Sequence, residues 1–410
     1  MNKYEINNFY DLYRVTEVRT PSDKRIYYEY DGLGRQSSRS TPDAGTVRYK
    51  YDRNDNLRFS QDRNQYNKPT ETPPGKYITF RGYDGLNRLL YIGDTYTENY
   101  LMQWESLNPN PGQNYGFENY SLAPENFLVI NVYDTLINFP ANANIFTSPP
   151  QDYYSEKNNT KGSLCATAYR TLGTDGWNFK YYRYDARGRV KKMWNYINGF
   201  GWKKTEYEYN SQNQVTEIEY RTTSDNDHKV FSYEYDKSGR LKISATDETR
   251  PPLPFAEYRY NQNSQIDSIF YSNGSYYITN YYNNRNWVTQ SSSSNNKLNY
   301  MLDYLANGNI GSQYINGDYK GNFSDTKEFR VNYFYDNSNR LIEVERFSTK
   351  YFDMSGEYSF YPDGNFLTLT RSYNSDNFSY DYYSGTNKLK KVSGLSGIPE
   401  IYQAEFISVK

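Results

Sequence analysis

The sequence contains one cysteine, Cys165, and one histidine, His228, among its 410 residues. A single thiol cannot form an intrachain disulfide, so the stability of the fold does not depend on oxidation. One Cys and one His also leave too few residues for a Cys/His zinc site, a thiol protease or a Ser-His-Asp triad. We expect Cys165 to be a small strand residue and His228 to lie in a solvated loop between strands. We therefore predict no catalytic, cofactor-binding or metal-binding residue and a protein that is not an enzyme.

An excess of one charge and long apolar runs are missing too. Lys and Arg total 47 and Asp and Glu total 48, so the net charge is -1. A nucleic-acid-binding protein would be expected to show a basic face, so we expect no nucleic-acid partner. No stretch approaches the length of a membrane span, and the first residues contain no apolar segment of a signal peptide. Either the protein stays inside the cell, or it belongs to a longer exported polypeptide, or another system carries it.

Aromatic residues are abundant. Tyr contributes 50 residues and Phe 21, whereas aliphatic residues are scarce. Aromatic side chains pack well across neighbouring strands, so this composition favours β-strands over long helices. The low mean hydropathy of -1.01 comes largely from Asn, Ser and Tyr, and Tyr carries a large apolar ring behind its hydroxyl. We therefore expect a folded chain with an aromatic and partly polar core.

A short pattern recurs along the chain: aromatic, any residue, Tyr, Asp or Asn, turn-forming residues, then Arg or Asn and an aliphatic residue. A fixed repeat is typical of repeat architectures. Weaker copies start at Tyr49, Tyr207, Tyr258, Tyr281, Asp303, Phe360 and Tyr380. The structural residues of the four clearest copies are Tyr30, Asp31, Gly34 and Arg35; Tyr184, Asp185, Gly188 and Arg189; Tyr235, Asp236, Gly239 and Arg240; and Tyr335, Asp336 and Arg340.

The chemistry of each copy predicts a β-hairpin. Tyr-x-Tyr has strand periodicity, the Asp or Asn bonds backbone amides ahead of it, and the following Gly or Asn tolerates positive φ. A single hairpin is marginal in water, so successive hairpins must stack into a continuous sheet. We predict an all-β fold in which stacked hairpins form a spiralling sheet.

The repeats divide the chain into three parts: N-terminal repeats in 1–92, a Pro- and Asn-rich interruption in 93–165, and the main array in 166–410. Asn131-Val132-Tyr133-Asp134 is a possible degenerate copy inside the interruption. The interruption is interpreted as a loop or plug on the sheet, with a separate binding module as the alternative. Carboxylates are plentiful enough for a glycosidase-type pair, but the repeated Asp residues occupy equivalent turn positions and are therefore interpreted as structural.

The repeated Tyr-Asp-x-x-Gly-Arg-Leu pattern resembles the Rhs or YD-repeat family. Tyr10-Asp11-Leu12-Tyr13-Arg14-Val15 and Leu172-Gly173-Thr174 are similar to segments of the Bacteroidetes-type members. The resemblance implies a strand ribbon that spirals into a hollow shell, as in bacterial Rhs toxins, toxin-complex cocoons and teneurins. In such polymorphic toxins of bacterial competition, the shell encloses a C-terminal toxin or effector domain. The resemblance therefore implies a secreted or cell-surface chain that is part of a larger polypeptide.

The chain departs from that family in two ways. We find no segment rich in Asp-Pro and Gly before Lys410, so no self-cleaving aspartates are assigned, and no toxin-like domain follows the last repeat. Our interpretation is a non-catalytic scaffold whose partners are the toxin or effector polypeptide or further shell segments. The alternative is a surface-exposed adhesion protein that recognises cell-surface glycans. A hydrolase on a repeat scaffold would need catalytic residues gathered within 93–161.

Overall fold

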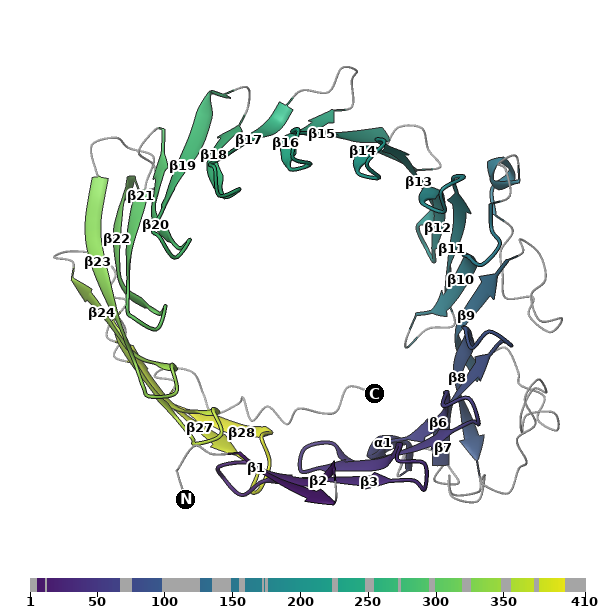
Figure 1. The fold of residues 1–410 in the computed structure, drawn as a ribbon. Helices are drawn as coiled ribbons and strands as arrows, with labels where there is room; N and C mark the ends of the chain where they lie inside the picture. Colours follow the sequence, from purple (N-terminus) through teal and green to yellow (C-terminus); the bar gives the residue numbers. More distant parts are fainter. Residues whose placement is uncertain are drawn as a thin grey trace. The chain divides into compact units, whose positions relative to one another are not determined.

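The computed structural model confirms an all-β protein. It describes residues 6–11, 13–66, 76–97, 126–134, 149–154, 159–171, 173, 176–222, 228–247, 254–271, 274–294, 299–318, 326–347, 355–371 and 376–394. Their 28 strands belong to one antiparallel sheet, and Figure 1 traces the strands in chain order. Two short helical segments accompany them, α1 (Arg63–Tyr66) and the 3₁₀-helix η3 (Gln151–Tyr153).

The chain divides into two compact units. The central unit comprises Tyr28–Ser40 and Ala44–Leu253, and the terminal unit comprises Met1–Tyr27, Thr41–Asp43 and Pro254–Lys410. The boundary falls inside β3. The strands that lie wholly or partly in the central unit are β3 (Arg25–Tyr30), β4 (Gln36–Thr41), β5 (Gly45–Tyr51), β6 (Leu57–Gln61), β7 (Lys76–Tyr83), β8 (Leu89–Thr97), β9 (Phe127–Tyr133), β10 (Leu164–Arg170), β11 (Trp177–Tyr184), β12 (Val190–Ile197), β13 (Gly201–Tyr209), β14 (Val215–Thr222), β15 (His228–Tyr235) and β16 (Leu241–Asp247).

The terminal unit joins the first strands to the last repeats. Its remaining strands are β1 (Asn7–Asp11), β2 (Arg14–Arg19), β17 (Pro254–Tyr260), β18 (Ile266–Tyr271), β19 (Tyr276–Tyr282), β20 (Val288–Ser293), β21 (Asn299–Tyr304), β22 (Ile310–Asp318), β23 (Thr326–Tyr335), β24 (Leu341–Phe347), β25 (Gly356–Phe360), β26 (Phe366–Arg371), β27 (Asp376–Tyr382) and β28 (Leu389–Ser393).

The repeated pattern forms hairpins with one turn geometry. At the turn between β15 and β16, the backbone N–H of Asp236 donates to the Arg240 carbonyl at 2.8 Å, and that of Gly239 donates to the Asp236 carbonyl at 3.0 Å. Gly239 has a φ of 79°. This is a type I turn followed by a left-handed residue, a common three-residue hairpin connection. Within the described residues, twelve turns share these two bonds: 20–24, 31–35, 52–56, 84–88, 185–189, 210–214, 236–240, 261–265, 283–287, 305–309, 336–340 and 361–365.

A bulge follows most of these turns. Glu234 of β15 pairs with Ile243, whereas Tyr235 pairs with Leu241, so Lys242 has no partner in the register. The same shift occurs at the repeat tyrosine of other hairpins, such as Tyr184, Tyr209 and Tyr335. A bulge strengthens the local twist and redirects the backbone of the return strand.

The largest buried cluster lies in the central unit, around β9 to β12. It consists of Ile130, Val132, Tyr153, Ala166, Ala168, Phe179, Tyr181 and Trp194. Elsewhere most strand residues are only half-buried, as the burial patterns of β5 and β13 show. Cross-strand side-chain pairs are therefore the main source of stability in most hairpins.

The hairpin pattern continues into the predicted interruption. β9 pairs with both β8 and β10, and the backbone N–H of Asp134 donates to the Ser163 carbonyl at 3.1 Å. The degenerate copy expected at residues 131–134 is thus confirmed as a hairpin strand that pairs with β10. Residues 98–125 and 135–148, on which the choice between plug and binding module depends, lie outside the described residues. The three-part division stays a prediction.

Candidate functional site

Half of these hairpin turns are built around an aspartate. Oδ1 of Asp336 accepts hydrogen bonds from the backbone N–H groups of Ser338 and Arg340 at 2.8 and 2.9 Å, and Oδ2 accepts one from Nε of Arg340 at 2.7 Å. Partial burial raises the pKa of Asp336, but these bonds outweigh burial and the pKa lies below its ordinary value. The same shift to lower pKa occurs at Asp31, Asp84, Asp185 and Asp236. The charged aspartate therefore stabilises the turn.

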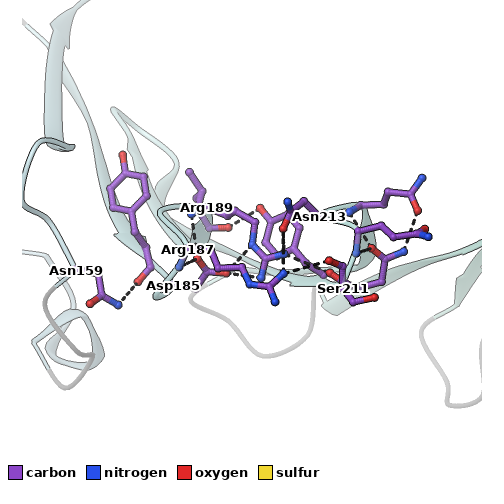
Figure 2. Close-up of polar contacts among 12 residues, drawn as sticks. Asn159, Asp185, Arg187, Arg189, Ser211 and Asn213 are labelled. Carbon is purple, nitrogen blue, oxygen red and sulfur yellow. Dashed lines mark hydrogen bonds and ion pairs between the residues drawn. The ribbon is translucent and has the colours of Figure 1, made fainter. Parts of the chain in front are cut away.

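The arginine of one turn also contacts the next hairpin. Nη1 of Arg189 lies 3.3 Å from the carbonyl oxygen of Asn210 and 2.9 Å from Oδ1 of Asn213. The Arg189 guanidinium also lies over the ring of Tyr209, at 4.3 Å from its centroid. Arg187 donates to the Ser211 carbonyl at 3.2 Å, as Figure 2 shows. We name this Arg-to-next-hairpin arrangement the inter-hairpin joint.

The inter-hairpin joint recurs in both units. In the central unit, Arg35 donates to the Asp52 carbonyl at 2.8 Å and lies 5.0 Å from the Tyr51 ring centroid. In the terminal unit, Arg340 donates to the Tyr361 carbonyl at 2.9 Å and lies over Phe360 at 4.9 Å. Charge-assisted hydrogen bonds are stronger than neutral ones, and the cation–π contact adds to them. The joint therefore couples the hairpins at these turns to the hairpins that follow them.

The repeat tyrosines form a second connection between hairpins. Tyr235 donates its hydroxyl hydrogen bond to the Val215 carbonyl, the first residue of the previous return strand, at 2.7 Å. Val215 lies at the bulge of that hairpin, where it pairs with Tyr209. Equivalent bonds run from Tyr83 to Leu57, Tyr184 to Leu164, Tyr209 to Val190, Tyr282 to Ile266, Tyr304 to Val288 and Tyr335 to Ile310. A phenylalanine at these positions would fill the space but lose the bond.

Two turns replace the charged pair with a neutral one. Asn210 donates from Nδ2 to Oε1 of Gln214 at 2.9 Å, and Asn261 donates to Gln265 at 2.8 Å. Gln214 also reaches the next turn, since its Nε2 donates to the Gly239 carbonyl at 2.7 Å. The Asp–Arg pair and the Asn–Gln pair are therefore two versions of the same joint. In both versions the two residues are four positions apart in the sequence.

The residues singled out from the sequence thus lie in separate hairpins. Gly34, Gly188 and Gly239 hold the left-handed position of their turns, with φ of 85°, 77° and 79°. Tyr30 ends β3, and Tyr184, Tyr235 and Tyr335 end their strands and make the hydroxyl bonds described above. Each copy brings its own Asp and Arg together, and the copies do not meet in one site. Their structural role stays a prediction.

One part of the predicted interruption packs on the sheet. The Tyr153 carbonyl accepts two hydrogen bonds from Arg183, at 3.0 and 2.8 Å, and the Arg183 guanidinium lies 3.7 Å from the Tyr153 ring centroid. Asp152 accepts from Nε1 of Trp194 at 3.0 Å and pairs with Lys204 at 2.8 Å. Tyr153 is fully buried, and burial raises the pKa of its hydroxyl. We name these contacts of η3 with β11 to β13 the clasp; no pattern in the sequence indicated it.

In the terminal unit, the first strands contact the last repeats. Nζ of Lys24, in the turn between β2 and β3, contacts Asp363 and donates to Oδ1 of Asn387 at 2.6 Å. Asn387 in turn donates from its backbone N–H to Asp43 at 2.6 Å. These bonds join residues more than 330 positions apart. The turns that contain Asp363 and Asn387 are therefore linked by polar contacts to the N-terminal turns that contain Lys24 and Asp43.

The two rare residues lie in strands. Cys165 is buried in β10, as predicted, and burial raises the pKa of its thiol. The prediction that His228 lies in a loop was wrong: it begins β15, pairs with Arg221 and lies 2.6 Å from Glu219. Arg221, its partner in the sheet, and Glu219, its side-chain partner, both belong to the preceding strand, so the residues next to His228 in the sequence do not indicate them.

In the described part of the chain, no cluster of three His, Cys, Asp or Glu residues is suited to a metal ion, and no helix is long and apolar enough to cross a membrane.

Comparisons with known proteins show the fold. No protein-family model and no curated protein matches the sequence. A mutant Tc holotoxin pore of Photorhabdus luminescens is 13% identical, with a TM-score of 0.67, over 96% of this chain and 18% of that one. The crystal structure of TcdB2-TccC3 is 12% identical, with a TM-score of 0.66, over 94% of this chain and 19% of that one.

The chain thus spans about a fifth of the length of these Tc toxin chains, and at this identity the similarity concerns the fold alone. It supports the Rhs or YD-repeat type of fold that the sequence pattern predicts. The Bacteroidetes-type grouping and the relation to teneurins stay predictions. Nearly the whole of this chain has the hairpin fold of a segment of the Tc toxin chains.

Proposed function

We propose that the chain forms part of the wall of a β shell that encloses a toxin or effector polypeptide. The observation that carries this proposal is the match of 96% of the chain to a segment of the Tc holotoxin pore chain. The inter-hairpin joint supports it, because a joint that recurs along both units suits an extended wall rather than a single site. The partners would be further shell segments and the enclosed polypeptide.

The wall would act sterically and not by catalysis. Its repeat residues are spread over successive turns, and the proposed role of Asp185, Arg189 and Tyr184 is to connect hairpins. With a net charge of -1, the wall would enclose a cargo without strong electrostatic attraction to it. The shell would be secreted or displayed at the cell surface as part of a larger polypeptide, in the manner of bacterial toxins.

Native material tests the proposal. We would purify the protein from its source cells and their culture fluid and determine its intact mass and peptides. We expect the repeats to be continuous with, or tightly bound to, an additional polypeptide that resists protease until urea opens the shell. A native protein without any additional polypeptide would contradict the proposal. So would an attached polypeptide that protease degrades equally fast before and after urea treatment.

A further inference from the structure

Polar side chains from four turns meet in the terminal unit. They are Lys24 in the turn before β3, Asp43 in the turn between β4 and β5, Asp363 and Asn365 in the turn between β25 and β26, and Asn387 in the turn before β28. The contacts between them join positions as far as 363 residues apart. An amine, two carboxylates and two carboxamides are thus gathered at one place, which no single turn could supply.

Lys24 and Asp363 form a pair that is largely shielded from water. Their side chains are 11% and 6% exposed, and Nζ of Lys24 contacts Oδ2 of Asp363. Within the described residues, Oδ1 of Asp363 is buried and has no hydrogen-bond partner. A buried carboxylate with an unpaired oxygen is costly, because water no longer solvates it. Transfer of a proton from Lys24 to Asp363 removes both charges and leaves a neutral amine, which is a nucleophile.

The same amine lies against the carboxamide of Asn387. Nζ of Lys24 is 2.6 Å from Oδ1 of Asn387. Because a C=O bond is about 1.2 Å long, Nζ also lies within about 4 Å of the carbonyl carbon Cγ, close to the separation of two atoms that are about to react. Holding an amine and an amide together in this way replaces a slow reaction between two molecules by a reaction within one.

Two neighbours hold and polarise the Asn387 carboxamide. Nδ2 of Asn365 donates to its Oδ1 at 2.7 Å, where negative charge develops when an amine adds to Cγ. Nδ2 of Asn387 donates to Oδ2 of Asp43 at 3.0 Å, and its backbone N–H donates to Oδ1 of the same carboxylate at 2.6 Å. The Asp43 carboxylate therefore lies where it would stabilise positive charge on a leaving nitrogen.

We propose that Lys24 and Asn387 form an intramolecular isopeptide bond. Asp363 takes a proton from the Lys24 ammonium, and the Nζ lone pair forms a bond to Cγ while the C=O electron pair moves onto Oδ1. Nδ2 then takes a second proton that Nζ releases. The carbonyl re-forms, the Cγ–Nδ2 bond breaks with its electron pair on nitrogen, and ammonia leaves and takes the proton held by Asp363. Asn387 is exposed, so the product escapes into water.

The bond would tie the turn before β3 to the turn before β28. A covalent link between positions this far apart in the sequence stabilises a fold by restricting the unfolded chain, as a disulfide does. It would fix the first strands on the last repeats of the terminal unit without any cysteine. This modification is separate from the encapsulating role and does not depend on an enclosed polypeptide.

The test is peptide mapping of the folded full chain by mass spectrometry after denaturation and digestion with trypsin. We expect the tryptic peptides 20–25 and 372–388 to be joined, with a combined mass lower by one ammonia. Fragmentation of the joined peptides should place the link between Lys24 and Asn387.

Three substitutions assign the roles. Lys24→Arg keeps the positive charge but removes the nucleophilic amine and should abolish the link. Asp363→Asn removes the base and should slow formation of the link about a hundredfold or more. Lys388→Arg changes the exposed lysine next to Asn387, keeps the trypsin site, and is the matched control that should leave the link unchanged.

Three results would overturn the proposal, and each can be read from the parent chain alone. The first is that trypsin cleaves after Lys24 and releases an unmodified peptide 372–388. The second is a loss of ammonia in peptide 372–388 with no second peptide attached, which would mean that Asn387 cyclises on its own backbone. The third is a link formed with loss of water, which would join Lys24 to a carboxylate instead. None of these results bears on whether the chain encloses a polypeptide, since that role is tested on native material.

Discussion

The hydroxyl of Tyr235 donates a 2.7 Å hydrogen bond to the backbone carbonyl of Val215, in the preceding hairpin. The ring is half-buried, so Tyr235→Phe keeps most of the packing and removes the bond. We expect this substitution to lower the free energy of unfolding by about 1 kcal/mol. Tyr235→Ala should lower it by about 2–3 kcal/mol, because the ring is lost as well. Urea unfolding followed by circular dichroism measures both effects.

Tyr233→Phe is the control for this bond. Tyr233 lies on the same strand two residues earlier, and within the described part of the chain no hydrogen bond of its hydroxyl is found. We expect its unfolding midpoint to stay unchanged. Equal losses for Tyr233→Phe and Tyr235→Phe would mean that the connection between hairpins does not depend on the hydroxyl.

Because the joint has two versions, we predict that the Asp–Arg pair of a turn can be replaced by Asn and Gln only when both residues are changed together. Asp336→Asn leaves Arg340 without its carboxylate, and Arg340→Gln leaves Asp336 without its cation. The double substitution recreates the neutral pair that Asn210 and Gln214 form at 2.9 Å. In a double-mutant cycle on urea unfolding, we expect a coupling energy of about 0.5–1 kcal/mol in favour of the matched pairs. Strictly additive losses would show that the two positions act independently.

The hairpins could be predicted from the sequence because their chemistry is local. Asp236, Gly239 and Arg240 lie within five residues, and their types alone specify a turn with a left-handed residue. The exchange of Asp and Arg for Asn and Gln was also visible in the printed sequence, at Asn210 and Gln214, as a paired change four residues apart. A comparison of the copies position by position would have found it.

The contacts between hairpins could not be predicted in this way. The bond from Tyr235 to Val215 depends on a bulge in another strand, and the clasp joins Tyr153 to Arg183 across 30 residues. The face on which Asn316 lies is likewise set by the register of β22 with β21, and a shift of one residue would turn it to the other face. His228 shows the same limit, because its polar neighbours indicated a loop while Glu219 supplied a partner in the sheet.

Ser264 occupies the left-handed position of its turn with a φ of 63°, where Gly239 stands in the equivalent turn. A serine side chain is disfavoured there, whereas glycine has no Cβ to clash. We expect Ser264→Gly to raise the free energy of unfolding by about 0.5–1 kcal/mol. Ser238→Gly, one position earlier in its own turn and outside the positive-φ residues, should give no gain. A similar gain at both positions would contradict this account.

The clasp predicts different effects at two adjacent tyrosines. Tyr153 is fully buried against Trp194, with ring centroids 5.3 Å apart, whereas Tyr154 is 48% exposed. Tyr153→Ala should lower the free energy of unfolding by about 3–5 kcal/mol, because it leaves a cavity in the largest buried cluster. It should also shift tryptophan emission to longer wavelength, since Trp194 gains access to water. Tyr154→Ala should change neither quantity, and equal effects at both sites would argue against the clasp.

Buried tyrosines predict how the protein unfolds in alkali. Burial raises the pKa of Tyr184 to about 12 and also raises the pKa of Tyr181. In the unfolded chain these phenols ionise near pH 10. The stabilisation from keeping them neutral is therefore fully present below about pH 10 and is lost as the pH rises through their raised folded-state pKa values, which for Tyr184 is about 12. Absorbance of phenolate at 295 nm should show an early group of exposed tyrosines and a late group that titrates together with the loss of strand signal. A single transition near pH 10 with the circular dichroism spectrum intact would show that these rings are open to water.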